Sequence, residues 1–518
     1  MSFLYDYGAA AAVAGVCSLL AWLFGGTVAS ALLPTIPWAI VIMAEFALCF
    51  PQRHSGETTY EARLRVWRAI RHDPLLWLVL LFMTMMCIPF VNKGLCPCCD
   101  YPAIHFDGAR AEPPIPYAPF CVNRLEHFNV LLWFLCAFSA MLATKHALLK
   151  RGKRMVLRLV VWNGVGLSAI GMIQRVFGAE TPLWAEGWSS SAYFFSTFGY
   201  PNMGGDYFTT LFCLAIASWR WDVDASRRNA ESDDPKTSGT TRHKVFWGKH
   251  IMLIPASIFY FSAMMTLSRA AILLVTALAI IFFAHALTSF LAVMSRKARV
   301  KTIAVNVVVL ILIATFFLLF LTSRDKIMMK IQPSGFGDDL SNEISTIEGR
   351  GILDRMSGKG QYHTRVALAV WKDNWLFGCG GWGYKHFCIP KMSKSDFDNI
   401  QSVGGINVHN DYLQFLAEHG VVGCLLLLVM FVLLIRPVFK TWKNLILASR
   451  FAKPKARPPR PVTIFALPGG AFAVLCAVIA TLLHGMADCP RRSPAVLTIF
   501  FVSLAAIDGF LPEIRKAK

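Results

Sequence analysis

Long apolar runs constrain the fold of this chain more than any other feature. Runs of roughly 17–25 mostly apolar residues, the length that crosses about 30 Å of hydrocarbon, recur along the whole sequence. Hydrophobic residues make up 55% of the chain and charged residues 16%, a balance that suits a bilayer better than water. The runs lie at 8–24, 28–50, 75–91, 127–144, 156–174, 203–219, 250–267, 270–294, 302–322, 421–435, 463–483 and 494–511. The predicted fold is therefore an all-α, polytopic membrane protein with about twelve transmembrane helices.

The distribution of positive charge predicts the orientation of these helices. The formal net charge is +20, and most Lys and Arg residues fall in six clusters. The clusters lie at 53–71, 145–158, 220–249, 295–301, 436–460 and 515–518. With twelve spans, all six clusters and both termini share one face, and positive charge in short loops marks the cytoplasmic side. We interpret the charge as a topology signal and expect membrane lipids, not nucleic acid, as its partners.

The predicted organisation has three parts. Residues 1–322 hold transmembrane helices one to nine, 323–412 form a large extracytoplasmic loop, and 413–518 hold helices ten to twelve. A loop of about ninety residues is unusual unless it is functional or has structure of its own. Within it, 364–375 carries apolar residues at helical spacing, which predicts an amphipathic helix on the membrane surface.

Cysteines on the predicted outer face have three interpretations. They are Cys96, Cys98, Cys99 and Cys121 in the first outer loop, and Cys379 and Cys388 in the large loop. In an oxidising compartment they can form disulfides, or they can remain free thiols. The CPCC run, with His105 nearby, is alternatively a metal site. For the candidate active site we expect no metal and no cofactor.

Two arginines on the predicted outer face stand beside apolar sequence. Arg269 lies in TLSRAAILLV, at the boundary between two apolar runs, where it is either functional or a snorkelling arginine in a tight helical hairpin. Arg365 precedes GCGGWG at 378–383. This pattern indicates a cation on a surface helix, followed either by a backbone that can approach a ligand closely or by an ordinary turn.

A histidine opens the segment that leads into the next predicted span. The segment 409–423 reads HNDYLQFLAEHGVVG. A neutral imidazole is the usual general base for a hydroxyl nucleophile, so His409 is a candidate base. Asn410 or Asp411 can equally be the N-cap of a helix.

Further polar residues lie at the outer ends of other predicted spans. Arg175 ends one span and Asn202 opens another, and His484 and Asp488 lie at the end of the eleventh. Asp488 is one helical turn from His484 and can orient it. Helix packing or capping is the alternative interpretation for each of these residues.

These elements resemble, in order and position, the signature of the O-antigen ligase and O-antigen polymerase family. The strongest part is the His409-Asn410 pair followed by Glu418 and a Gly-x-x-Gly. Arg365, an aromatic residue and the Gly-rich turn follow the family order, although the family's usual Pro before the glycines is Leu376-Phe377 here. The resemblance spans roughly 155–510 and includes a Ser-Arg-small pattern at Arg269.

The resemblance implies an enzyme of the inner membrane with its active face in the periplasm. It would be a metal-independent, inverting-type glycosyltransferase that takes a glycan from an undecaprenyl-diphosphate carrier. Arg269 and Arg365 would bind the diphosphate, since a guanidinium grips phosphate oxygens with two hydrogen bonds. His409 would accept the proton of the acceptor. The possible supporting residues are Asn410, Glu418, His484, Asp488, Asn202 and Arg175.

The acceptor and two rival functions remain open. Lipid A core as acceptor would make the protein a ligase of lipopolysaccharide biosynthesis, which we favour. Another repeat unit would make it a polysaccharide polymerase, and a protein Ser or Thr would make it an O-oligosaccharyltransferase. A lipid-carrier or polysaccharide transporter should place ionisable residues near the bilayer midplane, whereas the candidates here lie at the outer boundary. A non-catalytic assembly factor is the third possibility.

Overall fold

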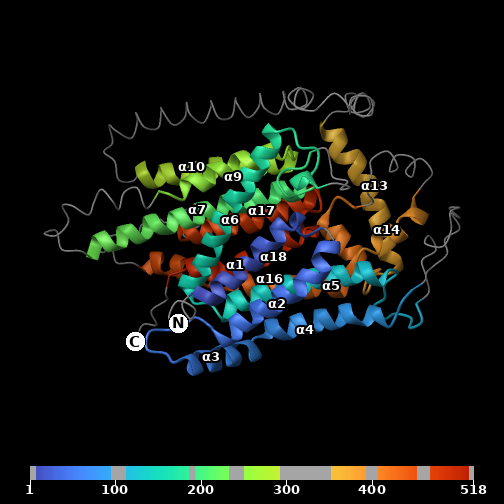
Figure 1. The fold of residues 1–518 in the computed structure, drawn as a ribbon, viewed down its shortest axis with the longest axis horizontal. Helices are drawn as coiled ribbons and strands as arrows, with labels where there is room; N and C mark the ends of the chain where they lie inside the picture. Colours follow the sequence, from blue (N-terminus) through green and yellow to red (C-terminus); the bar gives the residue numbers. More distant parts are fainter. Residues whose placement is uncertain are drawn as a thin grey trace. The chain divides into compact units, whose positions relative to one another are not determined.

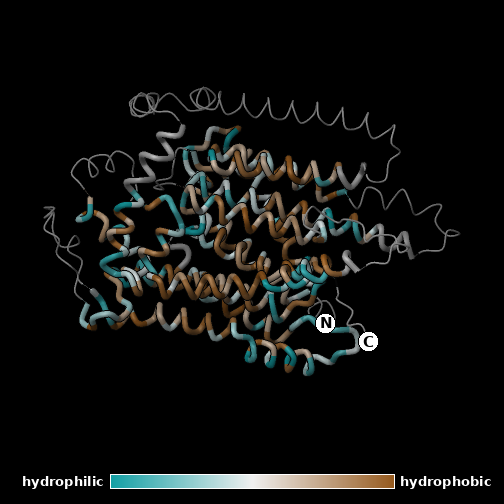
Figure 2. Tube along the Cα trace, turned by 180° about the vertical axis from the view of Figure 1, so that it is seen from behind, coloured by the Kyte–Doolittle hydropathy of each residue, from teal (hydrophilic) through white to brown (hydrophobic). Residues whose placement is uncertain are grey.

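The computed structural model describes residues 7–27, 29–94, 113–185, 193–232, 250–291, 352–392, 407–451 and 467–512. The described residues form α-helices and short helical turns, with no β-strand among them, as Figure 1 shows. Hydrophobic residues run along the lengths of most helices (Figure 2). These observations confirm the predicted helical, polytopic class.

The chain packs as two compact units, each built from segments that are distant in the sequence. The first unit comprises 1–153, 345–436 and 481–505, and the second comprises 154–344, 437–480 and 506–518. This division describes packing, whereas the predicted boundaries at 322 and 412 describe membrane topology and stay a prediction.

The first unit is organised around α5. Its helices are α1 (Ala9–Trp22), α2 (Ala29–Cys49), α3 (Thr59–Arg71), α4 (Pro74–Cys87), α5 (Arg124–His146), α13 (Ile352–Asp373), α14 (Tyr384–Phe387), the first part of α16 (Asp411–Phe451) and almost all of α18 (Pro494–Ala506). Phe134 and Phe138 of α5 pack against Phe82 of α4, with ring centroids 4.8 and 5.5 Å apart. Phe138 also meets Phe501 of α18 at 5.2 Å. Since α5 is buried around most of its circumference, it is the central helix of this unit.

The second unit contains most of α6 (Lys150–Val176), α7 (Pro201–Ser232), α9 (Leu253–Met265) and α10 (Arg269–Leu291). Small residues allow close approach at the start of α7. A Cβ added to Gly205 would lie 2.5 Å from the Cβ of Ala271, so the first turns of α7 and α10 are in tight contact. This contact brings the Asn202 region next to the Ser268-Arg269 turn.

Each predicted span overlaps a helix, except 302–322, which lies outside the described residues. By length and composition, five described helices can cross a membrane, or six if the bent pair α3–α4 counts as one span. The five are α5, α6, most of α10, α16 through Leu447, and α17 (Gly469–Ala487). Other apolar helices, including α1, α9 and α18, are shorter. The protein is thus a multi-pass membrane protein, and the count of twelve stays a prediction.

The described part of the large loop is a small packed cluster. The predicted helix at 364–375 is present as part of α13, with Val366, Ala367 and Val370 buried and Arg365 exposed. These apolar side chains form one core with residues that surround the Gly-rich turn and the start of α16: Phe120, Cys379, Tyr384, Cys388, Met392, Val408 and Ala417. The loop therefore has structure of its own, as its length suggests. That α13 lies on the membrane surface stays a prediction.

Backbone hydrogen bonds join the Gly-rich turn to a break in α16. The amides of Cys379 and Gly380 donate to the carbonyls of Ala417 and Glu418, each at 2.9 Å. The helix is interrupted at Gly420 (φ +63°), where the next two amides donate to the carbonyls of residues 375 and 376. In the described structure, the turn that contains these glycines approaches the backbone of α16. The predicted approach to a ligand stays a prediction.

Candidate active site

Asn410 is the N-cap of α16. Its Oδ1 accepts hydrogen bonds from the amides of Tyr412 (3.0 Å) and Leu413 (3.1 Å), and its Nδ2 donates to the Met486 carbonyl at 3.1 Å. Asn410 is therefore a helix N-cap, which is one of the two interpretations that the sequence allows. Residue 409 just before the cap has φ +53°, a left-handed backbone that is uncommon outside glycine and asparagine. The cap therefore fixes the backbone next to His409, and with it the position from which the His409 side chain extends.

The His409 ring faces the carboxylate of Asp488, which belongs to the last segment of the same unit. His409 Nδ1 lies 3.3 Å from Asp488 Oδ1, and the side chains are 36% and 8% exposed. The Cys489 amide donates to the same carboxylate oxygen at 2.6 Å, which fixes the carboxylate in place. A carboxylate at Nδ1 favours the tautomer with a proton on Nδ1 and a free lone pair on Nε2. The sequence pairs Asp488 with His484, and the structure adds His409 as a partner.

The α13 helix contacts the His409 ring through His363. The rings of His363 and His409 meet edge to face, with centroids 5.1 Å apart. Arg365 follows two residues later on α13 and is exposed. The structure therefore brings the helix that carries Arg365 to the imidazole of His409.

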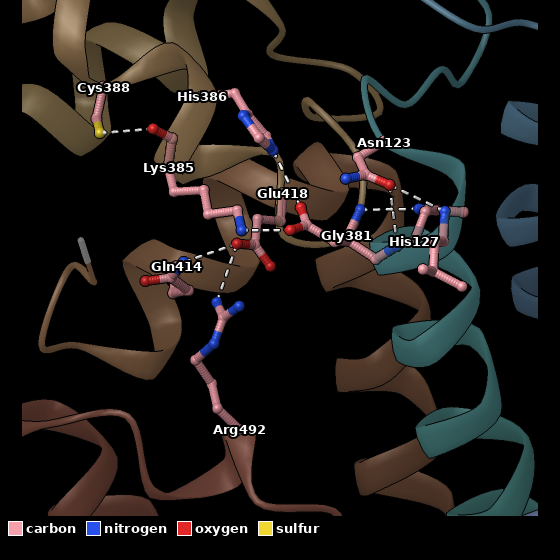
Figure 3. Close-up of polar contacts among 11 residues, drawn as sticks. Asn123, His127, Gly381, Lys385, His386, Cys388, Gln414, Glu418 and Arg492 are labelled. Carbon is pink, nitrogen blue, oxygen red and sulfur yellow. Dashed lines mark hydrogen bonds and ion pairs between the residues drawn. The ribbon is translucent and has the colours of Figure 1, made fainter. Parts of the chain in front are cut away.

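Two buried ion pairs are formed by residues that lie close to His409 and Asp488 in the sequence. Asp411 Oδ2 is 2.9 Å from Arg491 Nε, and Glu418 Oε1 is 2.9 Å from Arg492 Nη1, with every side chain at most 8% exposed. Gln414 donates to Glu418 at 2.7 Å and accepts from the Val408 amide at 2.8 Å. Figure 3 shows Gln414 and Arg492 converging on Glu418.

These pairs tie the turn that follows Asp488 to the first turns of α16. Burial lowers the pKa of Arg491, but the charge and hydrogen bond of Asp411 outweigh it, so the pKa is raised and the ion pair is maintained. Glu418 was a predicted supporting residue, whereas Arg491 and Arg492 were not predicted. The signal was available: two arginines directly before an apolar run are costly unless they have partners.

The Gly-rich turn is held from its other side by α5. Gly381 donates from its amide to His127 Nδ1 at 2.9 Å, and His127 Nε2 lies 2.8 Å from the Met86 carbonyl oxygen. Trp382, the next residue, stacks on the Arg492 guanidinium at 3.7 Å from the ring centroid. Figure 3 shows the approach of Gly381 to His127. The turn thus connects α5, the Arg492 pair and α16.

A second group of predicted residues lies in the other unit. The Ser268 hydroxyl donates to Asn202 Oδ1 and accepts from the Ala271 amide at 3.3 Å, so it caps α10 at the residue before Arg269. Arg269 is exposed. Arg175 donates to the Phe194 carbonyl at 2.7 Å and lies over the Phe194 ring. The structure therefore brings Asn202 to the Arg269 turn and gives Arg175 a local structural contact.

The described outer-loop cysteines are free thiols. Cys121, Cys379 and Cys388 are buried and form no disulfide among the described residues. Burial raises the pKa of Cys121 to about 11 and that of Cys379 well above its usual value. Of the three interpretations, the free thiol applies to these residues, whereas the CPCC run and His105 lie outside the described residues. Among the described side chains, no group of three or more His, Cys, Asp or Glu is arranged to hold a metal ion.

Comparison with known families bears on this arrangement. Residues 254–428 match the family model described as O-Antigen ligase. The predicted resemblance to the O-antigen ligase family is confirmed. The matched segment contains Arg269, Arg365, His409 and Glu418, while Asp488 lies beyond it. None of the curated proteins compared with the chain matches it. Members of the O-antigen ligase family are glycosyltransferase-like enzymes of the ligase or polymerase kind.

Proposed function

We propose that the protein transfers a glycan from undecaprenyl diphosphate to an acceptor hydroxyl, with lipid A core as the favoured acceptor. The reaction would take place at the periplasmic face of the inner membrane. The observation that supports this most directly is the contact of His409 with Asp488 at the capped start of α16. His409 lies inside the segment 254–428 that matches the O-antigen ligase family, and Asp488 lies outside it.

His409 would act as the general base. With Nδ1 directed to Asp488, Nε2 is available to take the proton of the acceptor hydroxyl as its oxygen attacks the anomeric carbon. The bond from that carbon to the diphosphate breaks with inversion, and the diphosphate leaves with the electron pair. Asp488 would stabilise the imidazolium that forms, as a carboxylate does in other base–carboxylate pairs.

Arg269 and Arg365 would bind the diphosphate. Both side chains are exposed; Arg269 is the first residue of the apolar helix α10, and Arg365 lies in the second half of the amphipathic helix α13. Fixed guanidinium groups stabilise the charge that develops on the leaving group without the need for a metal ion. Asn202, through Ser268, would support the Arg269 turn.

A transfer assay in proteoliposomes tests the proposal and identifies the acceptor. Purified protein would be offered undecaprenyl-diphosphate glycan with lipid A core, with carrier-linked repeat unit or with a Ser/Thr peptide, in the presence of EDTA. We expect transfer to lipid A core, reduced by about 10²–10⁴-fold in His409→Ala and strongly reduced in Arg365→Ala. Lys372→Gln, an exposed position on the same helix as Arg365, is the matched control and should keep full activity.

The outcomes separate the rival functions. Transfer to repeat unit or peptide instead would change the subclass and keep the chemistry. Full activity in His409→Ala would exclude this histidine as the base. Binding of the carrier lipid without transfer to any acceptor would favour a transporter.

A further inference from the structure

The α3 helix has the opposite composition to its apolar neighbours. It is defined by a capping box, in which the Thr58 amide donates to Glu61 Oε2 at 2.8 Å and the Glu61 amide donates to the Thr58 hydroxyl at 3.3 Å. This motif satisfies two amides that would otherwise be unpaired at the helix start. The helix is therefore a stable element with a hydrophilic sequence, between the apolar helices α2 and α4 (Figure 2).

One side of α3 packs on the protein, and the other side is exposed but not purely polar. Ala62 and Val66 are fully buried. On the opposite side Tyr60 is 69% exposed and Trp67 is 56% exposed. Residues spaced by three, four and seven positions share a helix face, so Arg71 continues the stripe formed by these two aromatic rings. Aromatic residues on an outward face are unusual in water and typical of the membrane–water interface.

Two arginines at the end of α3 carry uncompensated charge. Arg65 is paired with Glu57 at 2.9 Å, and Arg63 donates to the Cys49 carbonyl at 2.8 Å. Arg68 and Arg71, in the last turn, are exposed and form no ion pair among the described residues. The outward face therefore presents aromatic rings together with these two cations.

The junction with α4 places this face at the end of an apolar helix. The chain bends by 61° between α3 and α4. Pro74 starts α4, and Asp73 caps it with a 3.0 Å bond from the Leu75 amide. Asp73 is also 2.6 Å from Lys145 Nζ at the end of α5, which fixes the bend to a second apolar helix. Since α4 begins here and α5 ends here, the last turn of α3 lies beside the ends of two apolar helices. The ends of apolar helices are where hydrocarbon gives way to headgroups in a membrane.

We propose that the outward face of α3 binds the headgroups of anionic phospholipids. Tyr and Trp rings prefer the headgroup level, and exposed arginines near a bilayer are attracted to anionic lipid. A nucleic-acid site would need cations but no apolar helix, whereas the cations of α3 lie next to the apolar helix α4. We favour lipid over a protein partner because anionic headgroups complement the charges of Arg68 and Arg71, which lie next to an apolar helix. This function is independent of glycan transfer.

Hydrogen–deuterium exchange of the full-length protein in nanodiscs tests the proposal at the α3 amides themselves. Discs would contain one copy of the protein, in phosphatidylcholine alone or with added phosphatidylglycerol. We expect the anionic lipid to slow exchange at residues 59–71 by about 25-fold, because each of two arginines strengthens the association by about fivefold and the two factors multiply. In Arg68→Gln/Arg71→Gln this difference should disappear, while exchange in α5 stays unchanged and reports intact folding.

A matched control removes the same charge elsewhere. Lys93→Gln/Lys372→Gln replaces two exposed lysines outside α3 and should keep the full effect of phosphatidylglycerol on α3. Equal exchange of wild-type α3 in both lipids would overturn the proposal. So would a loss of the lipid effect in the lysine control as large as in the arginine variant, since the response would then follow net charge and not this face.

Discussion

At the scale of single residues, the sequence identifies candidates but not their partners. His409, Asn410 and Glu418 could be named because they share one short segment with a recognisable order. The contact of His409 with Asp488 joins positions 79 residues apart, and Arg492 meets Glu418 across 74. No periodicity in the sequence encodes such a pairing, because it depends on how the end of α17 packs against the start of α16.

Replacement of Asp488 by Asn should disable His409 without removing it. An amide cannot stabilise the imidazolium, so we expect Asp488→Asn to lose about 10²–10⁴-fold in transfer. Asp488→Asn combined with His409→Ala should be hardly worse than His409→Ala, because residues that act as a unit are not additive. Asp224→Asn, which alters an i,i+4 pair on α7, is the control. Additive losses in the proteoliposome assay would argue against a shared function.

The two buried ion pairs should be far more sensitive than a partly exposed pair. In Glu418→Gln, Arg492 stays buried without its carboxylate, which costs about 3–5 kcal/mol. Glu57→Gln removes the partner of Arg65 in a pair whose side chains are 29% exposed (Arg65) and 13% exposed (Glu57), and should cost about 1 kcal/mol. Thermal unfolding in detergent should therefore show a large decrease in midpoint for the first variant and a small one for the second. Equal decreases would contradict this ranking.

At the scale of elements, the helices were predictable and the function of the Gly-rich turn was not. Apolar length predicted α5, α6 and α17 directly, and the spacing of apolar residues predicted α13. The glycines at 378–383 could be recognised as a turn, but the sequence offered no means of choosing between a ligand and another backbone segment as its neighbour. The break in α16 at Gly420 was likewise not predicted, although the apolar run begins only after Glu418-His419-Gly420.

The close approach at Gly378 should make this position much less tolerant than a glycine of similar backbone conformation in open space. Gly378 (φ +75°) would place a Cβ 2.3 Å from the Glu418 backbone, whereas Gly56 (φ +81°) has nothing within 4 Å. Gly56→Ala should cost about 1–2 kcal/mol of left-handed strain. Gly378→Ala should cost about 1–3 kcal/mol more, from overpacking. The measurement is the decrease in unfolding midpoint of each variant under the same conditions. Equal decreases would mean that the α16 backbone moves to make room for the new Cβ, and would contradict the prediction.

At the scale of the whole molecule, composition was sufficient for the class and insufficient for the packing. The apolar content and the length of the runs predicted a multi-pass helical membrane protein. The division into two units was not predictable, because each unit combines segments that lie far apart along the chain. Hydropathy reports which residues enter the bilayer and carries no information about which helices are neighbours.

Topology mapping should place all the proposed catalytic residues on one face. The positive clusters predict that reporters fused after residues 153 and 450 are active in the cytoplasm, and that those fused after 268 and 409 are active in the periplasm. Paired fusions with a reporter active only in the cytoplasm and one active only in the periplasm give the comparison at each point. Residues 268 and 409 on opposite faces would rule out a single active site that contains both Arg269 and His409.

The hydrogen bonds between the Gly-rich turn and the break in α16 also determine how this region can be recombined. Each segment provides the donors for one half of the bonds and the acceptors for the other half, so neither has its native backbone partners without the other. A chimera that takes only the large loop from a relative would combine a turn and a helix break that have not been matched to each other. Loop exchange intended to alter substrate choice should therefore transfer 375–381 and 417–422 together, as one cassette.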